Sequence, residues 1–343
     1  LGALTNSKRP ECFVDGVYPS HVERGQGAYV YDLAKKAYID FIMGLGSTVL
    51  GYANTEVGTV VARQWGMGAN LSLPTDLELR VAEKVIEIFP CIQSLRFLKT
   101  GSEACNAAIR IARAYTSRNI VLSQGYHGHG EEYTSLVEPA YGVMRHDNIK
   151  TLGSDLSQIT SEVAAVIIEP GLLEFSKERA KYLTDLGERC TKMGAVLIFD
   201  EIITGFRVPR FSVSNYYGIK PDLICLGKAM ASGMPISVVG GRREIMNCKE
   251  YFVSSTFAGE TLSLAAALKT MTLLQTKYSI EDLWERGKVF LDKFNKLWPE
   301  KIRIDGYPTR GVFEGDPMTI ALFWQEACRA GILFGKSWML AFP

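Results

Sequence analysis

The sequence has no long apolar run, no C-x-x-C pair and almost no net charge. A membrane-spanning helix needs roughly 20 apolar residues, so no association with a membrane is expected. The 38 basic and 37 acidic side chains leave a formal net charge of +1, which argues against electrostatic binding of nucleic acid. Seven scattered cysteines, an odd number, favour a reducing compartment over a disulfide scaffold. The sequence therefore predicts a cytoplasmic protein.

The length of 343 residues predicts about two domains, at roughly 150 residues per domain. With 47% hydrophobic and 22% charged residues the composition is that of a globular protein. The first thirty residues show neither a signal peptide nor an Arg-rich transit segment. Because the chain begins at Leu1 and not at a methionine, a preceding targeting peptide stays an open question.

The fold class predicted is α/β. Between about residues 95 and 260, short apolar β-branched runs alternate with helical patterns, as in strands joined by crossover helices. The runs are apolar throughout, which indicates a mostly parallel sheet covered on both faces by helices. Expected strands are 95–99, 120–123, 164–168, 195–199, 223–226 and 236–239, and expected helices are 102–115, 177–193, 262–277 and 281–297.

Three positions at the ends of these strands could carry chemistry. Thr100-Gly101-Ser102 precedes a strong helix, whose free N–H groups and dipole favour a phosphate, although Ser102 could be an ordinary N-cap. Asp200 ends an apolar strand, where α/β sheets place their ligands, although it could cap the next helix. Lys228 follows the next strand by one glycine and could form a Schiff base, although most lysines are solvated surface groups.

The combination is more specific than its parts. A phosphate cradle, a buried acid and a lysine arrive in chain order at three strand ends of one sheet. They are the set expected for pyridoxal 5′-phosphate, which needs a phosphate anchor, a partner for its pyridine nitrogen and a lysine for its aldehyde. The sequence therefore predicts pyridoxal 5′-phosphate as cofactor.

Other motifs carry less weight. Residues 331–337 resemble a Walker A loop but are one residue short and lack the framing strand and helix. Gly44-Leu45-Gly46 lacks the third glycine of a dinucleotide fingerprint. His127 and His129, followed by Glu131 and Glu132, could suggest a metal, but an H-x-H pair without further Cys or His is more typical of a solvated loop. No metal is expected.

At these residues the sequence resembles the class III aminotransferases of pyridoxal-phosphate fold type I, in particular the glutamate-1-semialdehyde 2,1-aminomutase-like subgroup. The resemblance runs from about Asn6 to the last residues. Its most specific segments are Thr100-Gly101-Ser102-Glu103-Ala104, Gly125-Tyr126-His127-Gly128, Glu169-Pro170, the stretch 199–207, and 221–228. It implies a large cofactor domain with a mostly parallel seven-stranded sheet (51–260) and a smaller α+β domain from the N-terminal segment (1–50) and residues 261–343.

The resemblance also implies roles for single residues. Lys228 would form the internal aldimine, Asp200 would pair with the pyridine nitrogen, and Gly101 and Ser102 would bind the phosphate. Tyr126, which could otherwise be a core aromatic, would stack on one ring face and Ile202 would pack on the other. The remaining residues implied are His127 and Glu169 at the cofactor, Ser7 in the substrate segment, and Thr256, which would reach the phosphate of the neighbouring subunit in a homodimer.

Departures from the subgroup put the substrate in question. Leu45 stands where the aminomutases have tryptophan, Asn6-Ser7-Lys8-Arg9-Pro10 replaces Asn-Ser-Pro-Val-Arg, and Gly259-Glu260-Thr261 replaces Gly-Asn-Pro. The last change is similar to aminotransferase-like proteins of surface-sugar pathways. The predicted function is a dimeric aminotransferase that moves an amino group from a small-molecule donor to the aldehyde or ketone of a small polar, sugar-like acceptor. The alternatives are the aminomutase itself, which makes 5-aminolevulinate, and a non-catalytic protein that keeps the fold.

Overall fold

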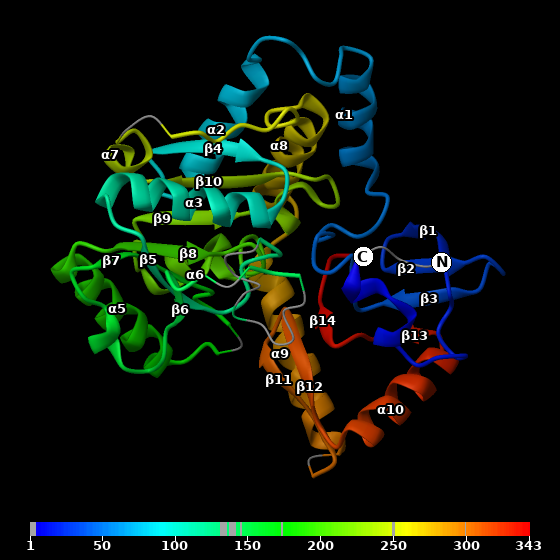
Figure 1. Cartoon of the computed structure of the whole chain (residues 1–343). Helices are drawn as coiled ribbons and strands as arrows, with labels where there is room; N and C mark the ends of the chain where they lie inside the picture. Colours follow the sequence, from blue (N-terminus) through cyan, green and yellow to red (C-terminus); the bar gives the residue numbers. More distant parts are fainter. Residues whose placement is uncertain are drawn as a thin grey trace.

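The computed structural model describes residues 5–130, 136, 142–144, 146–172, 174–248, 251–298 and 300–343. A seven-stranded sheet lies at its centre in the order β4-β10-β9-β8-β7-β5-β6 (Figure 1). Only β10 runs antiparallel to its neighbours. The predicted α/β class with a mostly parallel sheet is therefore confirmed. The strands are β4 (Ser94–Leu98), β5 (Ile120–Gln124), β6 (Ile149–Thr151), β7 (Val163–Ile168), β8 (Val196–Asp200), β9 (Leu223–Leu226) and β10 (Ser237–Gly241).

Both faces of this sheet are buried. Alternate residues of a strand point to opposite faces, and in β7 Ala165 and Ile167 join one hydrophobic cluster while Val166 and Ile168 join another. Helix α3 (Gly101–Thr116) covers the first face. Helices α2 (Asp76–Ile88), α5 (Lys177–Met193) and α8 (Thr261–Thr276) supply the other cluster. Coverage on both faces explains why the central strands β7 and β9 are apolar at every position.

Local signals set the helix ends. Thr100 caps α3, because its side chain accepts the backbone N–H of Glu103 while the Glu103 carboxylate accepts the Thr100 N–H. Helix α5 ends at Gly194, whose φ of +67° is favourable for glycine. The predicted strands and helices match the observed bounds closely. Within the large sheet the one strand without a predicted counterpart is β6, which has three residues.

Two smaller sheets are built from the two ends of the chain. The first contains β1 (Val22–Gln26), β2 (Tyr29–Asp32) and β3 (Ala37–Asp40), and β13 (Ile332–Leu333) pairs with β3 in parallel. The second contains β11 (Ile302–Tyr307), β12 (Arg310–Gly315) and β14 (Ser337–Met339). The N-terminal and C-terminal segments therefore share a sheet, whereas the domain boundaries at residues 50 and 260 stay a prediction.

Five further α-helices are described outside the layers already named. They are α1 (Thr55–Trp65), α6 (Val213–Tyr217), α7 (Arg243–Met246), α9 (Ile280–Leu297) and α10 (Pro317–Arg329). Helix α10 extends beside β13, away from the large sheet (Figure 1). Among the described residues, none of the helices has the length and apolar character that a bilayer crossing requires.

A buried arginine connects the chain ends to the large sheet. Arg207, which is 0% exposed, follows β8 and donates to the carbonyl oxygens of Gly46, Thr48 and Leu340. Burial lowers the pKa of its guanidinium to about 10. Two main-chain segments that lie far apart in sequence, at residues 46–48 and at residue 340, thus share one donor group.

Replacing Arg207 by methionine should therefore destabilise the protein. Buried carbonyl groups that lose their donors cost about 1–3 kcal/mol each, so we expect a loss of roughly 3 kcal/mol or more. The measurement is urea denaturation of the cofactor-free protein, followed by tryptophan fluorescence. Arg63→Met, at an exposed position of α1, is the control and should change stability by less than about 0.5 kcal/mol. Equal losses in the two variants would contradict this role.

Candidate active site

The carboxyl ends of β4, β5, β7, β8 and β9 meet at one edge of the large sheet. A cavity of about 200 Å³ lies at this edge. Ligands of α/β sheets bind at such an edge. The cavity is lined by Gly101, Ser102, Cys105, Tyr126, His127, Gly128, Glu169, Asp200, Ile202, Ile203 and Lys228.

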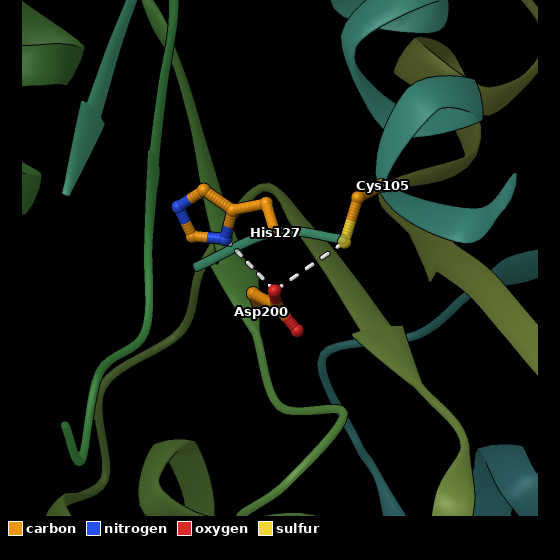
Figure 2. A group of neighbouring side chains, drawn as sticks. All are labelled: Cys105, His127 and Asp200. Atoms are coloured by element: carbon orange, nitrogen blue, oxygen red, sulfur yellow. Dashed lines mark hydrogen bonds and ion pairs between the residues drawn. The ribbon is translucent and has the colours of Figure 1, made fainter. Parts of the chain in front are cut away.

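Asp200 lies at the floor of this cavity and is only 5% exposed. Its Oδ1 accepts the backbone N–H of Ile202 at 3.0 Å, and its Oδ2 lies 2.8 Å from Nδ1 of His127 and 3.4 Å from Sγ of Cys105. Figure 2 shows the imidazole and the thiol approaching the same carboxylate oxygen. The cap of helix α6 is Ser212, so the interpretation of Asp200 as the cap of the next helix is wrong.

Lys228 follows β9 and faces the same cavity as Asp200. Its φ of +40° lies in the left-handed region, which costs a residue with a side chain about 1–3 kcal/mol. Burial lowers the pKa of its amine, and the charges of Asp200 and Glu169 oppose this change. The surface interpretation of Lys228 is therefore wrong, because its amine is held in a partly dry cavity beside two carboxylates.

The N-terminus of α3 borders the cavity at Gly101 and Ser102. Because the cap is Thr100, the interpretation of Ser102 as an ordinary N-cap is also wrong. The Ser102 Oγ instead accepts the backbone N–H of His129 at 3.1 Å. The loop approaches so closely that a Cβ at Gly128, where φ is +98°, would lie 2.1 Å from this oxygen. The first turn of α3 thus has uncapped N–H groups and a hydroxyl at the cavity.

Tyr126 and Ile202 line the same cavity from different loops. Tyr126 is 60% exposed, so it is not a core aromatic. Ile202 packs against the start of α3, and a Cβ at Gly101 would lie 2.9 Å from its Cγ2. A flat ring placed in this cavity would have an aromatic side chain and an aliphatic side chain available for its faces.

Glu169 links this cavity to the second small sheet. Its Oε1 accepts the backbone N–H of Tyr126 at 2.8 Å, and its Oε2 lies 3.6 Å from Nη1 of Arg310 in β12. Burial and the nearby Asp200 raise the pKa of Glu169, and the positive charge of Arg310 opposes this rise. Sequence reasoning missed Arg310, because nothing local to Thr309-Arg310-Gly311 indicates a partner more than a hundred residues away.

Two of the predicted site residues lie elsewhere. Ser7 lines a second cavity, of about 430 Å³, together with Gly44 and Leu45. Thr256 is exposed and does not line the cofactor cavity of its own chain. The roles of Ser7 and Thr256 stay predictions.

The H-x-H loop differs from its predicted solvated form. His127 is 1% exposed and contacts Asp200, whereas His129 is exposed. Burial of the loop against β8 explains the difference. Cys105, His127 and Asp200 bring three possible metal-ligand atoms within 4.8 Å of one another. Contacts with Cys225 and Asp200 and burial keep the Cys105 pKa well above its usual value, which disfavours the thiolate that a metal binds. Glu131 and Glu132 lie outside the described residues.

A strand-edge cavity with a lysine, a buried carboxylate and a helix N-terminus defines an enzyme of the pyridoxal-phosphate type. Comparison with known proteins narrows the class. The sequence profile described as aminotransferase class-III matches residues 14–146 and 141–336. The chain belongs to the class III aminotransferase family, whose enzymes use pyridoxal 5′-phosphate.

Curated relatives and solved structures agree with this assignment. The chain is 36% identical to a glutamate-1-semialdehyde 2,1-aminomutase of Nitrosospira multiformis, over 76% of this chain and 68% of the relative. It is 31% identical to the enzyme of that name from Syntrophobacter fumaroxidans, over 95% and 86% of the two chains. The FumI protein of a Sphingopyxis species, solved in its pyridoxal-phosphate internal aldimine form, superposes with a TM-score of 0.89 over 99% of this chain and 87% of its own, at 22% identity.

The residues of the cavity fit this cofactor. It needs an amine for its aldehyde, an anion for its ring nitrogen and N–H donors for its phosphate, and Lys228, Asp200 and the start of α3 offer these groups around one space. Lys228 and Asp200 lie at the ends of neighbouring strands, since Asp200 pairs with Cys225 in β9 and Lys228 follows that strand. The chemistry of the donor set therefore agrees with the family.

The lowered pKa of Lys228 gives a testable pH dependence. A lysine with a lowered pKa is neutral, and hence nucleophilic, at a lower pH than an ordinary lysine. We expect the pH profile of reductive methylation of Lys228 in the cofactor-free protein to have its midpoint below 10.5, the usual value. Competitive labelling with peptide mass spectrometry measures this midpoint.

The matched control is Lys181, an exposed lysine whose pKa is raised by Asp185. Its labelling midpoint should lie above that of Lys228. Because burial slows access to Lys228, the midpoints are compared and not the absolute rates. A reversed order would show that burial does not dominate the environment of Lys228.

Proposed function

We propose that the protein is an aminotransferase that moves an amino group from a small-molecule amino donor to the aldehyde or ketone of a small polar, sugar-like acceptor. The observation that carries the amine chemistry is the placement of the Lys228 amine and the Asp200 carboxylate on one cavity at the N-terminus of α3. Leu45, which stands where the aminomutases have tryptophan, supports the transferase over the aminomutase.

Each cavity residue has a part in this proposal. Bound pyridoxal 5′-phosphate supplies an aldehyde for amines and a ring that withdraws electrons from the substrate carbon. Ser102 and the N–H groups of α3 bind the phosphate, and Asp200 holds a proton at the ring nitrogen. Tyr126 and Ile202 pack on the two faces of the ring. Glu169 and His127 fix the loops that carry or contact these residues.

Lys228 has two tasks. Its neutral amine would hold the cofactor at its aldehyde, and the same amine, when free, would be the base that takes the proton from the substrate carbon. A lowered pKa suits both tasks, because a neutral amine is a nucleophile and a base. The strained backbone at Lys228 is the kind of cost that functional positions carry.

The aminomutase is the second candidate, because the curated relatives carry that name at 31% and 36% identity. Both reactions use the same cavity residues and differ in the source of the amino group. A transferase takes it from a donor and releases a keto compound. The aminomutase returns it to the same carbon skeleton.

The cofactor spectrum of the purified protein distinguishes the two. We expect candidate amino donors to convert the bound cofactor to its amine form, with release of a keto acid, because an aminotransferase takes the amino group from a donor. The measurement is the absorption spectrum together with quantification of the keto acid. Formation of 5-aminolevulinate from glutamate 1-semialdehyde without a donor would establish the aminomutase instead.

Asp200→Asn should keep the fold and lose most of the activity. An amide cannot hold the ring nitrogen protonated, so the ring becomes a weaker electron sink. Losing one preorganised electrostatic partner typically costs about 10²-fold or more in rate. Steady-state kinetics of the loaded enzyme check this, with Asp222→Asn, an acidic residue that precedes β9, as control. Near-normal rates in Asp200→Asn would remove Asp200 from the mechanism.

We also propose that the active unit is a homodimer. Several large apolar side chains are more than half exposed on two adjoining segments, which the bonds from Thr261 to Gly68 and Ala69 hold together. Exposed apolar patches of this kind mark protein interfaces. A second copy of this chain is the proposed partner, because Thr256, which is predicted to reach the neighbouring subunit, lies in one of the two segments. The exposed side chains are Trp65, Met67, Leu71, Leu73, Leu79, Phe252 and Phe257.

Heterodimers of Thr256→Ala and Lys228→Ala chains test the role of Thr256. If its hydroxyl reaches the phosphate of the partner, one site of the heterodimer carries both lesions and the other is intact. We expect recovery of one cofactor and about half of the wild-type activity per heterodimer, measured after mixing and separation of tagged chains. Absence of a working site would show that Thr256 acts within its own chain, and full cofactor retention and activity in the Thr256→Ala homodimer would show that it has no role.

A further inference from the structure

Cys105 is a cavity residue to which the proposed function gives no task. It lies on the face of α3 that packs on the large sheet, and it is 0% exposed. Its Sγ is 3.4 Å from Oδ2 of Asp200, the oxygen that also contacts His127 (Figure 2). The thiol therefore contacts the carboxylate from the face of the sheet that α3 covers.

A second thiol lies behind the first. Cys225 in β9 is the register partner of Asp200, is also 0% exposed, and belongs to the same hydrophobic cluster as Cys105. Contact with Cys225, burial and the charge of Asp200 together raise the pKa of Cys105 well above its ordinary value. Cys105 is thus a neutral thiol, and a neutral thiol beside a carboxylate donates its hydrogen.

The strength of this donor matters for the ring nitrogen. Each hydrogen bond donated to a carboxylate stabilises its negative charge and lowers the negative potential that it presents to another group. A thiol is a weak donor, and a hydroxyl in the same place would be a stronger one. With the contact from His127 to the same oxygen unchanged, the donor strength of residue 105 therefore adjusts how strongly Asp200 holds a proton on the ring nitrogen.

We propose that Cys105 is a positioning residue for Asp200, whose weak S–H donor orients the carboxylate while leaving most of its charge for the pyridine nitrogen of the cofactor. The residue acts through Asp200 and not on the substrate. The proposal rests on the cofactor of the family, and it holds whether the reaction is an amino transfer or an aminomutase reaction.

Two substitutions should shift the ring nitrogen in opposite directions. Cys105→Ser supplies a stronger donor, so the nitrogen should lose its proton at lower pH. Cys105→Val fills a similar space without a donor, so the nitrogen should hold its proton to higher pH. We expect displacements of about half a pH unit or more each way. The readout is the ¹⁵N chemical shift of bound pyridoxal 5′-phosphate labelled at the ring nitrogen, recorded against pH in the loaded enzyme.

The opposite directions expected for the serine and valine variants distinguish a hydrogen-bonding role of Cys105 from a role in packing alone. A variant that merely disturbs α3 would move the resonance the same way for both substitutions. Cys190→Val, a buried thiol of α5 in the other hydrophobic cluster, is the matched control and should leave the shift unchanged. If the serine variant does not fold, Cys105→Thr replaces it, because threonine has the shape of valine and carries a hydroxyl donor, and it should move the resonance in the direction expected for serine. Unchanged shifts in the Cys105 variants, or shifts of one sign for serine and valine, would overturn the proposal.

Discussion

A carboxylate buried at the end of a central strand is the constraint on which the site depends. Burying a charge is costly unless donors and opposite charge surround it. Three groups make hydrogen bonds with the Asp200 carboxylate. They are His127 from the loop after β5, the backbone N–H of Ile202 from the turn after β8, and Cys105 from α3. These elements form the walls of the cavity that faces Lys228. The fold thus places a buried carboxylate in the cavity, as the proposed pairing of Asp200 with the ring nitrogen requires.

Arginines from outside the central sheet connect this site to the rest of the molecule. Arg310 in β12 approaches Glu169, and the buried Arg207 binds carbonyl groups of the N-terminal and C-terminal segments. The guanidinium group suits both places, because it presents several donors in a rigid plane. Arg310 therefore ties the second small sheet to the cavity, and Arg207 ties the two chain ends to the turn that follows β8.

The sequence predicted most of the large sheet and the centre of the site. Apolar runs bounded by glycine and polar residues are visible locally, and the carboxyl ends of parallel strands share an edge, so Asp200 and Lys228 could be placed together. Other features depend on tertiary contacts. The three-residue strand β6 includes the exposed Lys150, the burial of His127 depends on Asp200, and Arg310 meets Glu169 across a long separation. Thr100 and not Ser102 caps α3, and the sequence could not decide between them because both are good capping residues two positions apart.

The central claim is that Lys228 is the lysine that binds the cofactor aldehyde. Borohydride reduction of the protein loaded with pyridoxal 5′-phosphate fixes the cofactor on whichever lysine forms the carbon–nitrogen double bond, and peptide mass spectrometry locates it. The account predicts one pyridoxyl group per chain, on Lys228, and no such label at that site in Lys228→Ala. A stoichiometric label on another lysine of the wild-type protein would contradict it.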